Sequence, residues 1–349
     1  MAAIDLLFDQ RDHSERVHQV ALSGLLLHSR LLGAILQRPG LRVTEVDWQP
    51  ERGRFDLACT VSVPDGSLTR VYVELKVDGA LDKEQFDRQI SHVHSIGPTA
   101  HLLYLVLGLS QFSVTDDRLQ KWAQTDDRRA LVHRCDAQQL AERLASPQIQ
   151  PPQSDPQQRD VRDLASAYRD VLLRLLARTE RYAEQIPRAW QPADFYGFFA
   201  ECRRESVGRM ANAGISYAAN PKGGFIACHW QWTPIHPNEP LRLYLQLEDQ
   251  KLCLKLKVPD EHKAQRKKLW DKAKEALRAT QEARRATQEA RRAASSADLA
   301  LTESNYHSGV HTTFAYVADV FGEGPLDRER FAQTIKQAEE LLASVASKL

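Results

Sequence analysis

Two acidic residues and a lysine stand at spacings that could bring them together on one face of a β-hairpin. Asp56 lies in the first of two runs rich in strand-forming residues, and Glu74 and Lys76 lie in the second, at 71–77. In the second run apolar residues occupy every other position, which predicts a strand with one face in a core. A Pro-Asp-Gly-Ser turn at 64–67 joins the two runs. Pairing around this turn would bring Asp56 towards Glu74.

Two carboxylates placed together form a site of hard oxygen ligands, which suits Mg²⁺ held by one or two carboxylates, water and a substrate phosphate. A neighbouring lysine can orient or deprotonate an attacking water and stabilise the charge that grows on phosphorus. Taken alone, a Glu-x-Lys pair on the polar face of a strand is more often a solvated surface feature. The ordered set of an Asp, a turn, Glu-x-Lys and then a helix carrying Gln85 favours the chemical interpretation.

This ordered set resembles the PD-(D/E)XK nuclease superfamily, which includes restriction endonucleases and RecB-like nucleases. The resemblance implies that Asp56 and Glu74 bind Mg²⁺ together with the backbone carbonyl of Leu75, and that Mn²⁺ can substitute. It also implies that Lys76 positions or activates the attacking water, and that Gln85 orients Lys76 or a phosphate.

The resemblance covers roughly residues 12–110 and departs from the family pattern in one place. RecB-like members often carry Gln-x-x-x-Tyr on the helix, whereas this chain has Gln85 followed by Gln89, so the tyrosine is absent. In the superfamily an acidic residue on the first helix sometimes joins the metal site, and Glu15 is the candidate here. The alternative, which the spacing favours, is a helix-capping box formed by Asp12 and Glu15.

The elements around these residues predict an α/β domain. We expect a long amphipathic helix over 12–38, ended by Pro39-Gly40. Strands are expected at 42–48 and 102–107, and helices at 82–94, 117–123 and 136–145. This order fits a restriction-endonuclease-like mixed sheet flanked by helices.

A Pro/Gln-rich stretch at 147–160 has little to bury and predicts a linker. It would separate a nuclease-like domain at 1–146 from a C-terminal α+β domain at 161–349, with a regulatory or substrate- or partner-binding role. The second domain would open with a long helix over 161–186, and alternating leucines predict a hairpin over 241–258. Further strands are expected at 214–219, 224–232 and 312–317, and helices at 261–293 and 327–349.

Basic and aromatic side chains gather on the strands of this second domain. Lys251, Lys255 and Lys257 would share the polar face of the hairpin, and Trp230 and Trp232 would share one face of the preceding strand. Such residues could hold nucleic acid through phosphate contacts and base stacking. The pattern is more typical of a solvated strand face with core tryptophans.

The predicted helix over 261–293 contains an exact repeat, because Arg-Ala-Thr-Gln-Glu-Ala-Arg at 278–284 recurs at 285–291. Seven residues turn a helix by about 700°, about 20° short of two turns, so the repeat keeps one face aligned. It lacks the large apolar residues of a coiled-coil seam. We expect a solvated extension that tolerates changes in length, with a basic arm on DNA as the alternative.

Composition limits the function classes. The 349 residues include 47 lysines and arginines against 46 acids, so any basic surface must be local. Five scattered cysteines without a Cys-x-x-Cys argue against a disulfide framework or zinc knuckle. We expect a cytoplasmic protein without a membrane partner, since no signal pattern or membrane-spanning apolar run is present. The motifs of P-loop ATPases, α/β-hydrolases and zinc proteases are also absent.

These observations predict a Mg²⁺-dependent nuclease that hydrolyses phosphodiester bonds in DNA, by analogy a restriction or anti-phage defence effector. The alternative is a non-catalytic protein that binds nucleic acid or a partner on a nuclease-like core. The retained Asp, Glu and Lys argue against that alternative. The C-terminal domain could also mediate a homo-oligomer or bind a partner protein.

Overall fold

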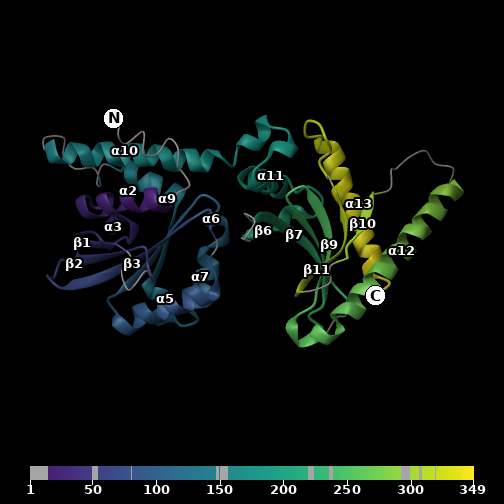
Figure 1. The fold of residues 1–349 in the computed structure, drawn as a ribbon, viewed down its shortest axis with the longest axis horizontal. Helices are drawn as coiled ribbons and strands as arrows, with labels where there is room; N and C mark the ends of the chain where they lie inside the picture. The colour runs from purple at the N-terminus through teal and green to yellow at the C-terminus, as the bar shows by residue number, and fades with distance from the viewer. Residues whose placement is uncertain are drawn as a thin grey trace. The chain divides into compact units, whose positions relative to one another are not determined.

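The computed structural model describes residues 15–48, 54–79, 81–146, 149, 156–218, 224–235, 239–291, 299–305, 309–318 and 320–349, with side chains except at 156–158 and 287–291. By its contacts the chain divides into two compact units, Met1–Arg178 and Thr179–Leu349 (Figure 1). The chain is a mixed α/β protein with one sheet in each unit.

The first unit contains a five-stranded mixed sheet. Its strands, in spatial order, are β1 (Arg42–Trp48), β2 (Leu57–Ser62), β3 (Leu68–Val77), β4 (His101–Leu107) and β5 (Val132–Asp136). The first three pair antiparallel, whereas β4 and β5 continue the sheet parallel to β3. The β2–β3 hairpin predicted around the turn at 64–67 is confirmed, with Leu57 opposite Val73.

Helices cover both faces of this sheet. One face packs against α2 (Glu15–His28), α3 (Leu31–Ile35), α9 (Ala137–Ala145) and α10 (Pro156–Ala177). The other packs against α5 (Lys83–Ile96), α7 (Asp116–Ala123) and α8 (Asp126–Leu131), and the short α6 (Ser110–Ser113) follows β4. Figure 1 shows α2 and α10 on one side of the sheet and α5 on the other. Both faces of β3 are therefore buried, although the sequence alternation predicted only one.

Two predicted features of the first unit differ in the structure. The single helix expected over 12–38 is interrupted after His28, where the Ser29 hydroxyl accepts a hydrogen bond from the N–H of Leu31 and donates one to the carbonyl of Leu25. Such local side-chain bonds compete with continuous helix. Residues 12–14 of the predicted helix lie outside the described residues.

The other difference concerns α10, which sequence analysis assigned to a domain at 161–349. Its apolar face, including Tyr168 and Leu172, is part of the first unit's core, and the Tyr168 hydroxyl is hydrogen-bonded to His18 Nδ1 at 3.0 Å. The division between the units therefore follows α10 rather than falling at 147–160. The helix also ends at Ala177 rather than at 186, and two short 3₁₀ turns follow, η1 (Arg181–Glu184) and η2 (Pro187–Ala189).

The second unit contains a six-stranded antiparallel sheet in the order β10-β11-β9-β8-β7-β6. The strands are β6 (Gly214–Ala218), β7 (Phe225–Pro234), β8 (Arg242–Glu248), β9 (Lys251–Lys257), β10 (Leu301–Glu303) and β11 (His311–Val317). The helices are α11 (Pro192–Arg204), α12 (Arg266–Arg291) and α13 (Arg328–Ala346), with 3₁₀ turns η3 (Met210–Asn212) and η4 (Asp260–Gln265). The predicted β8–β9 hairpin is confirmed, whereas α11 and β10 were not predicted.

None of the helices in the described part of the chain combines the length and the apolar character needed to cross a bilayer.

Candidate functional site

Asp56 is the residue before β2, and its carboxylate is held by two elements, β3 and α2. Its own N–H donates to the carbonyl of Val73 at 3.1 Å, the residue that pairs with Leu57 at the end of the hairpin, so Asp56 is attached to β3 one residue before Glu74. One carboxylate oxygen accepts from the N–H of Leu75 at 2.7 Å, and the other accepts from Nε2 of Gln19 on α2 at 2.7 Å. Leu75 points its side chain into the core with α2 and is 1% exposed.

Glu74 lies in the middle of β3 and is only 4% exposed. Its Oε1 accepts from Lys76 Nζ and from Gln85 Nε2, both at 2.7 Å. Its Oε2 accepts from Gln89 Nε2 at 2.8 Å. The two glutamines are one turn apart on α5, so a single helix face presents both amides to the carboxylate. Asp82 caps this helix by accepting from the N–H of Gln85, which fixes where that face begins.

Gln89 is itself held by a buried tyrosine. The Tyr104 hydroxyl on β4 donates to Gln89 Oε1 at 2.6 Å, and Gln89 Nε2 also donates to the carbonyl of Arg54 at 3.0 Å. Tyr104 pairs with Glu74 across the parallel β3–β4 ladder. A tyrosine thus lies beside the two glutamines. It comes from β4, whereas the RecB-like motif has its tyrosine on the helix, at the position that Gln89 occupies here.

Glu15 begins α2 and also reaches β3. Its Oε1 accepts from the N–H of Val77 at 3.3 Å, and its charge interacts with those of Lys76 and Asp56. Asp12, the partner in the alternative capping box, lies outside the described residues. The structure therefore brings Glu15 together with Asp56, Glu74, Lys76 and Gln85, although they come from four different elements.

The cluster combines three partly or fully buried carboxylates with one ammonium group. Burial raises the pKa of Glu74, and the charge of Asp56 raises it further, against the opposing charge of Lys76. Burial also raises the pKa values of Asp56 and Glu15. Burial lowers the pKa of Lys76, but the surrounding carboxylates outweigh this effect and leave its pKa above the ordinary value. Lys76 is therefore a charged ammonium at neutral pH.

The donor set can be compared with what a divalent cation needs. Within the described part of the chain, no three His, Cys, Asp or Glu side chains converge as metal ligands. Mg²⁺ is commonly held by only one or two protein carboxylates, with water and phosphate completing its shell. Asp56 and Glu74 fit this requirement in type and number, and their raised pKa values show carboxylates that a nearby cation would stabilise. The backbone carbonyl of Leu75 belongs to the same strand segment.

Sequence reasoning missed Gln19 and Tyr104, and left the role of Gln89 open. Gln19 lies on a predicted amphipathic helix without any motif to mark it, and Tyr104 lies in the apolar run of β4. A polar residue inside an otherwise apolar buried strand was the available signal for Tyr104, since buried hydroxyl groups need a partner.

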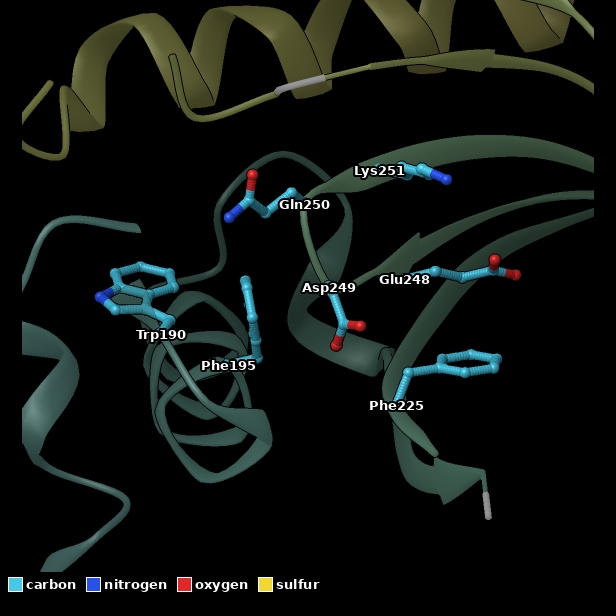
Figure 2. A pocket seen from close by; sticks show the side chains of 7 residues that line it. All are labelled: Trp190, Phe195, Phe225, Glu248, Asp249, Gln250 and Lys251. Atoms are coloured by element: carbon cyan, nitrogen blue, oxygen red, sulfur yellow. The ribbon is translucent and has the colours of Figure 1, made fainter. Parts of the chain in front are cut away.

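A pocket of about 420 Å³ lies in the second unit, and none of the predicted site residues lines it. It is formed by Trp190, Phe195, Phe225, Glu248, Asp249, Gln250 and Lys251, at the turn between β8 and β9. Figure 2 shows the Asp249 carboxylate directed between Phe195 and Phe225, with the ammonium of Lys251 pointing away. Burial raises the pKa of Asp249 to about 6. The pocket and the carboxylate cluster are thus built from different residues.

Comparison with known proteins identifies no relative. No family model, curated protein or solved structure matches this chain.

Proposed function

We propose that this chain is a Mg²⁺-dependent nuclease of the PD-(D/E)XK type that hydrolyses phosphodiester bonds in DNA. The observation that supports the proposal is the convergence of Asp56, Glu74 and Lys76 at the β2–β3 hairpin, next to Gln85 on the following helix. The first unit would then be a restriction-endonuclease-like core. A role in restriction or anti-phage defence would rest on analogy alone.

In this proposal Asp56 and Glu74 hold the metal, with the Leu75 carbonyl as a further ligand. The bound ion would supply Lewis-acid stabilisation of the phosphoryl oxygens and a more acidic water. Gln85 and Gln89 hold the Glu74 carboxylate in place through their amides. When the metal binds, the Glu74 carboxylate would have to give up at least one of its contacts with Gln85, Gln89 or Lys76 in exchange for the metal.

The protonation state of Lys76 decides its part in the reaction. Because its pKa is raised in the free protein, Lys76 carries a proton and cannot accept another from water. In this proposal it would act as a partly buried positive charge that orients the attacking water and stabilises the negative charge developing on phosphorus. A role in proton removal would require that the metal first neutralise the carboxylates that raise the pKa of Lys76.

The second candidate is a protein that binds nucleic acid or a partner on the same core without turnover. One observation favours it: each carboxylate oxygen of Asp56 and Glu74 already accepts a hydrogen bond from the protein. A fully satisfied polar network can serve to hold a buried core in one arrangement.

Cleavage of plasmid, single-stranded DNA and RNA by the purified full-length protein, in Mg²⁺, Mn²⁺ and Ca²⁺, separates the two candidates. Asp56→Asn and Glu74→Gln should weaken Mg²⁺ binding, measured by calorimetry, and abolish cleavage. Lys76→Ala should keep metal binding and lose about two orders of magnitude or more in rate. Gln85→Ala should lose rate partially. Ca²⁺ should support DNA binding with little cutting, because its geometry is looser.

Lys83→Ala is the matched control for the lysine variant. Lys83 lies on α5, the helix that carries Gln85, but it pairs with Asp87 at the exposed surface. It should cut at the wild-type rate. Cleavage by Lys76→Ala at the wild-type rate, or by the two carboxylate variants in Mg²⁺, would show that the site is misplaced. Intact DNA under all conditions, with a folded protein, would leave the binding candidate.

A further inference from the structure

The sheet of the second unit has helices on one face. The helices α11, α12 and α13 contact strands of this sheet, and Figure 1 shows α12 and α13 on the same side of it. Strand alternation turns Leu243, Leu245 and Leu254 towards this helix-covered side, where all three are fully buried. The intervening residues of β8 and β9 lie on the opposite face, which we call the helix-free face. It is defined by Phe225, His229, Trp232, Arg242, Tyr244, Gln246, Glu248, Lys251, Cys253, Lys255, Lys257, His311, Thr313 and Tyr316.

A β-bulge in β7 places a tryptophan on the helix-free face. The register with β8 shifts between Trp230 and Thr233, and Gln231 adopts a φ of 56°. Trp230 is consequently 1% exposed and donates through Nε1 to Glu339 of α13 at 2.8 Å, whereas Trp232 is 41% exposed on the other side. The sequence prediction that both tryptophans share a face is therefore wrong, because the bulge adds a residue between them.

Trp232 belongs to an aromatic group that is held in a fixed geometry. Its ring stacks on that of Tyr244, with centroids 4.1 Å apart and planes inclined by 15°. The Tyr244 hydroxyl is hydrogen-bonded to His311 Nδ1 at 2.9 Å, and His229 meets Trp232 edge-on at 5.5 Å. Tyr244 is 1% exposed, so the stack rests on the sheet and presents the tryptophan to solvent.

The charge of the helix-free face is positive. Its described strand residues include Arg242, Lys251, Lys255 and Lys257, against Glu248 as the carboxylate. Lys255 pairs with Glu248 and is nearly buried. Lys257 holds its ammonium 5.7 Å from the Trp232 ring, so a cation stands beside the exposed aromatic surface. Lys251 and Lys257 are six residues apart on β9, about 20 Å, which is long enough to reach several phosphates.

We propose that the helix-free face binds single-stranded nucleic acid, with a base stacked on Trp232 and phosphates held by Lys251 and Lys257. Stacking on an exposed aromatic ring needs an unpaired base, which a duplex does not present. Cations beside that ring match the phosphates that flank each base. A protein partner is less well matched, since Lys255 and Glu248 neutralise each other and the remaining charges, Arg242, Lys251 and Lys257, are all basic. This binding goes beyond the proposed cleavage site, because it uses other residues and requires no metal.

The test is binding of a fluorescein-labelled oligothymidylate to the full-length protein, followed by fluorescence anisotropy in EDTA at several salt concentrations. Trp232→Ala should weaken binding about tenfold or more, since base stacking contributes about 1–3 kcal/mol per base. Trp232→Phe should recover most of the affinity. Replacing Lys251 and Lys257 together by Ala should reduce the slope of log Kd against log salt concentration by about 1.4. This is the change expected when two phosphate contacts to a single strand are lost.

Trp48→Ala is the matched control, because Trp48 is 39% exposed on β1 and also lies beside a cation, Arg16. It should bind the oligonucleotide like the wild type. Equal affinity of Trp232→Ala and Trp48→Ala would overturn the proposal, as would an unchanged salt slope in the lysine variant. Absence of oligonucleotide binding by the folded wild type would overturn it in favour of a protein partner. Because EDTA removes the metal needed for cleavage, this assay measures binding alone. The binding result therefore does not depend on whether the nuclease proposal holds.

Discussion

Glu74 is the residue that contacts most of the other side chains of the candidate site. It is contacted by Lys76 from its own strand and by Gln85 and Gln89 from α5, and its charge interacts with that of Asp56. A carboxylate this deeply buried is stable only when its oxygens are satisfied or compensated by charge. Each of these neighbours therefore affects the stability of the buried Glu74 carboxylate.

The pH dependence of stability tests the charge state of Asp56. Because burial raises its pKa above 3.8, the folded protein holds a proton on Asp56 more readily than the unfolded chain does. Its contribution to stability is then complete below pH 3.8 and is lost as pH rises through the folded-state pKa. Asp56→Asn cannot ionise, so its free energy of unfolding relative to wild type should increase as pH rises above 3.8. Urea denaturation across this range measures the change.

Asp65→Asn provides a control of opposite sign. Its pKa is lowered by hydrogen bonds from Ser67 in the turn at 64–67, so the ionised form is the one that stabilises the fold. The stability of Asp65→Asn relative to wild type should therefore decrease as pH rises towards 3.8 and stay constant above that pH. A flat curve for Asp56→Asn above pH 3.8, like the one expected there for Asp65→Asn, would contradict the raised pKa of Asp56.

Removing the Tyr104 hydroxyl tests the buried chain from Tyr104 through Gln89 to Glu74. Tyr104→Phe leaves the Gln89 carbonyl oxygen without its donor, which should cost about 1–3 kcal/mol in the free energy of unfolding. Combined with Gln89→Ala, the loss should be smaller than the sum of the two single losses, because the contact is then already absent. Strictly additive losses in urea denaturation would show that the two residues act independently.

At the scale of elements, β3 organises the first unit. It pairs antiparallel with β2 and parallel with β4, and helices cover both of its faces. The apolar positions of β3 pack towards α2 and α10, so the polar positions are presented to α5 at the other face. This arrangement explains why Glu74 is buried and Lys76 is partly buried rather than solvated.

The repeat in α12 predicts a tolerance to deletions of seven residues. The described packing of α12 ends near Thr280, which is 4% exposed, and Arg278 pairs with Glu303. Deleting 285–291 gives the same sequence as deleting 278–284, so Arg278 and Thr280 keep their identities. The free energy of unfolding should change by no more than about 0.5 kcal/mol, the usual range for surface changes.

A deletion of four residues should behave differently. Removing 278–281 would bring Glu282 to the position of Arg278, opposite Glu303, and Arg284 to the buried position of Thr280. Like charges and a buried unpaired guanidinium should lower the thermal midpoint markedly. Equal effects of the two deletions would refute the importance of helix phase.

At the scale of the whole molecule, the position of α10 determines where the chain can be divided. A fragment ending at 178 keeps Tyr168, Val171 and Leu172 in the core, whereas a fragment ending at 146 exposes the surface that they cover. We expect residues 1–178 and 179–349 each to fold alone, with cooperative thermal unfolding seen by circular dichroism. Residues 1–146 should unfold at a markedly lower temperature. A fragment 1–146 as stable as 1–178 would contradict the assignment of α10.

The sequence by itself determined the local elements and the pairing that depends on them. Period-two alternation and a turn at 64–67 are enough to define the β2–β3 hairpin, and the length of the turn fixes its register. Extended by one pair beyond Leu57 and Val73, that register predicts that Asp56 lies near Glu74. The β8–β9 hairpin is another case, since alternating leucines flank its turn on both sides.

Tertiary structure alone decided the contacts made between distant segments. Gln19 and Tyr104 reach the site because α2 and β4 pack beside β3, and no local pattern records which helix meets which strand. The helix α10 belongs to the first unit because its apolar face packs in that unit's core. The amphipathic pattern shows that the helix has an apolar face, but not which core this face packs against. The separation of Trp230 from Trp232 required a bulge, and a single inserted residue reverses the face of every side chain that follows.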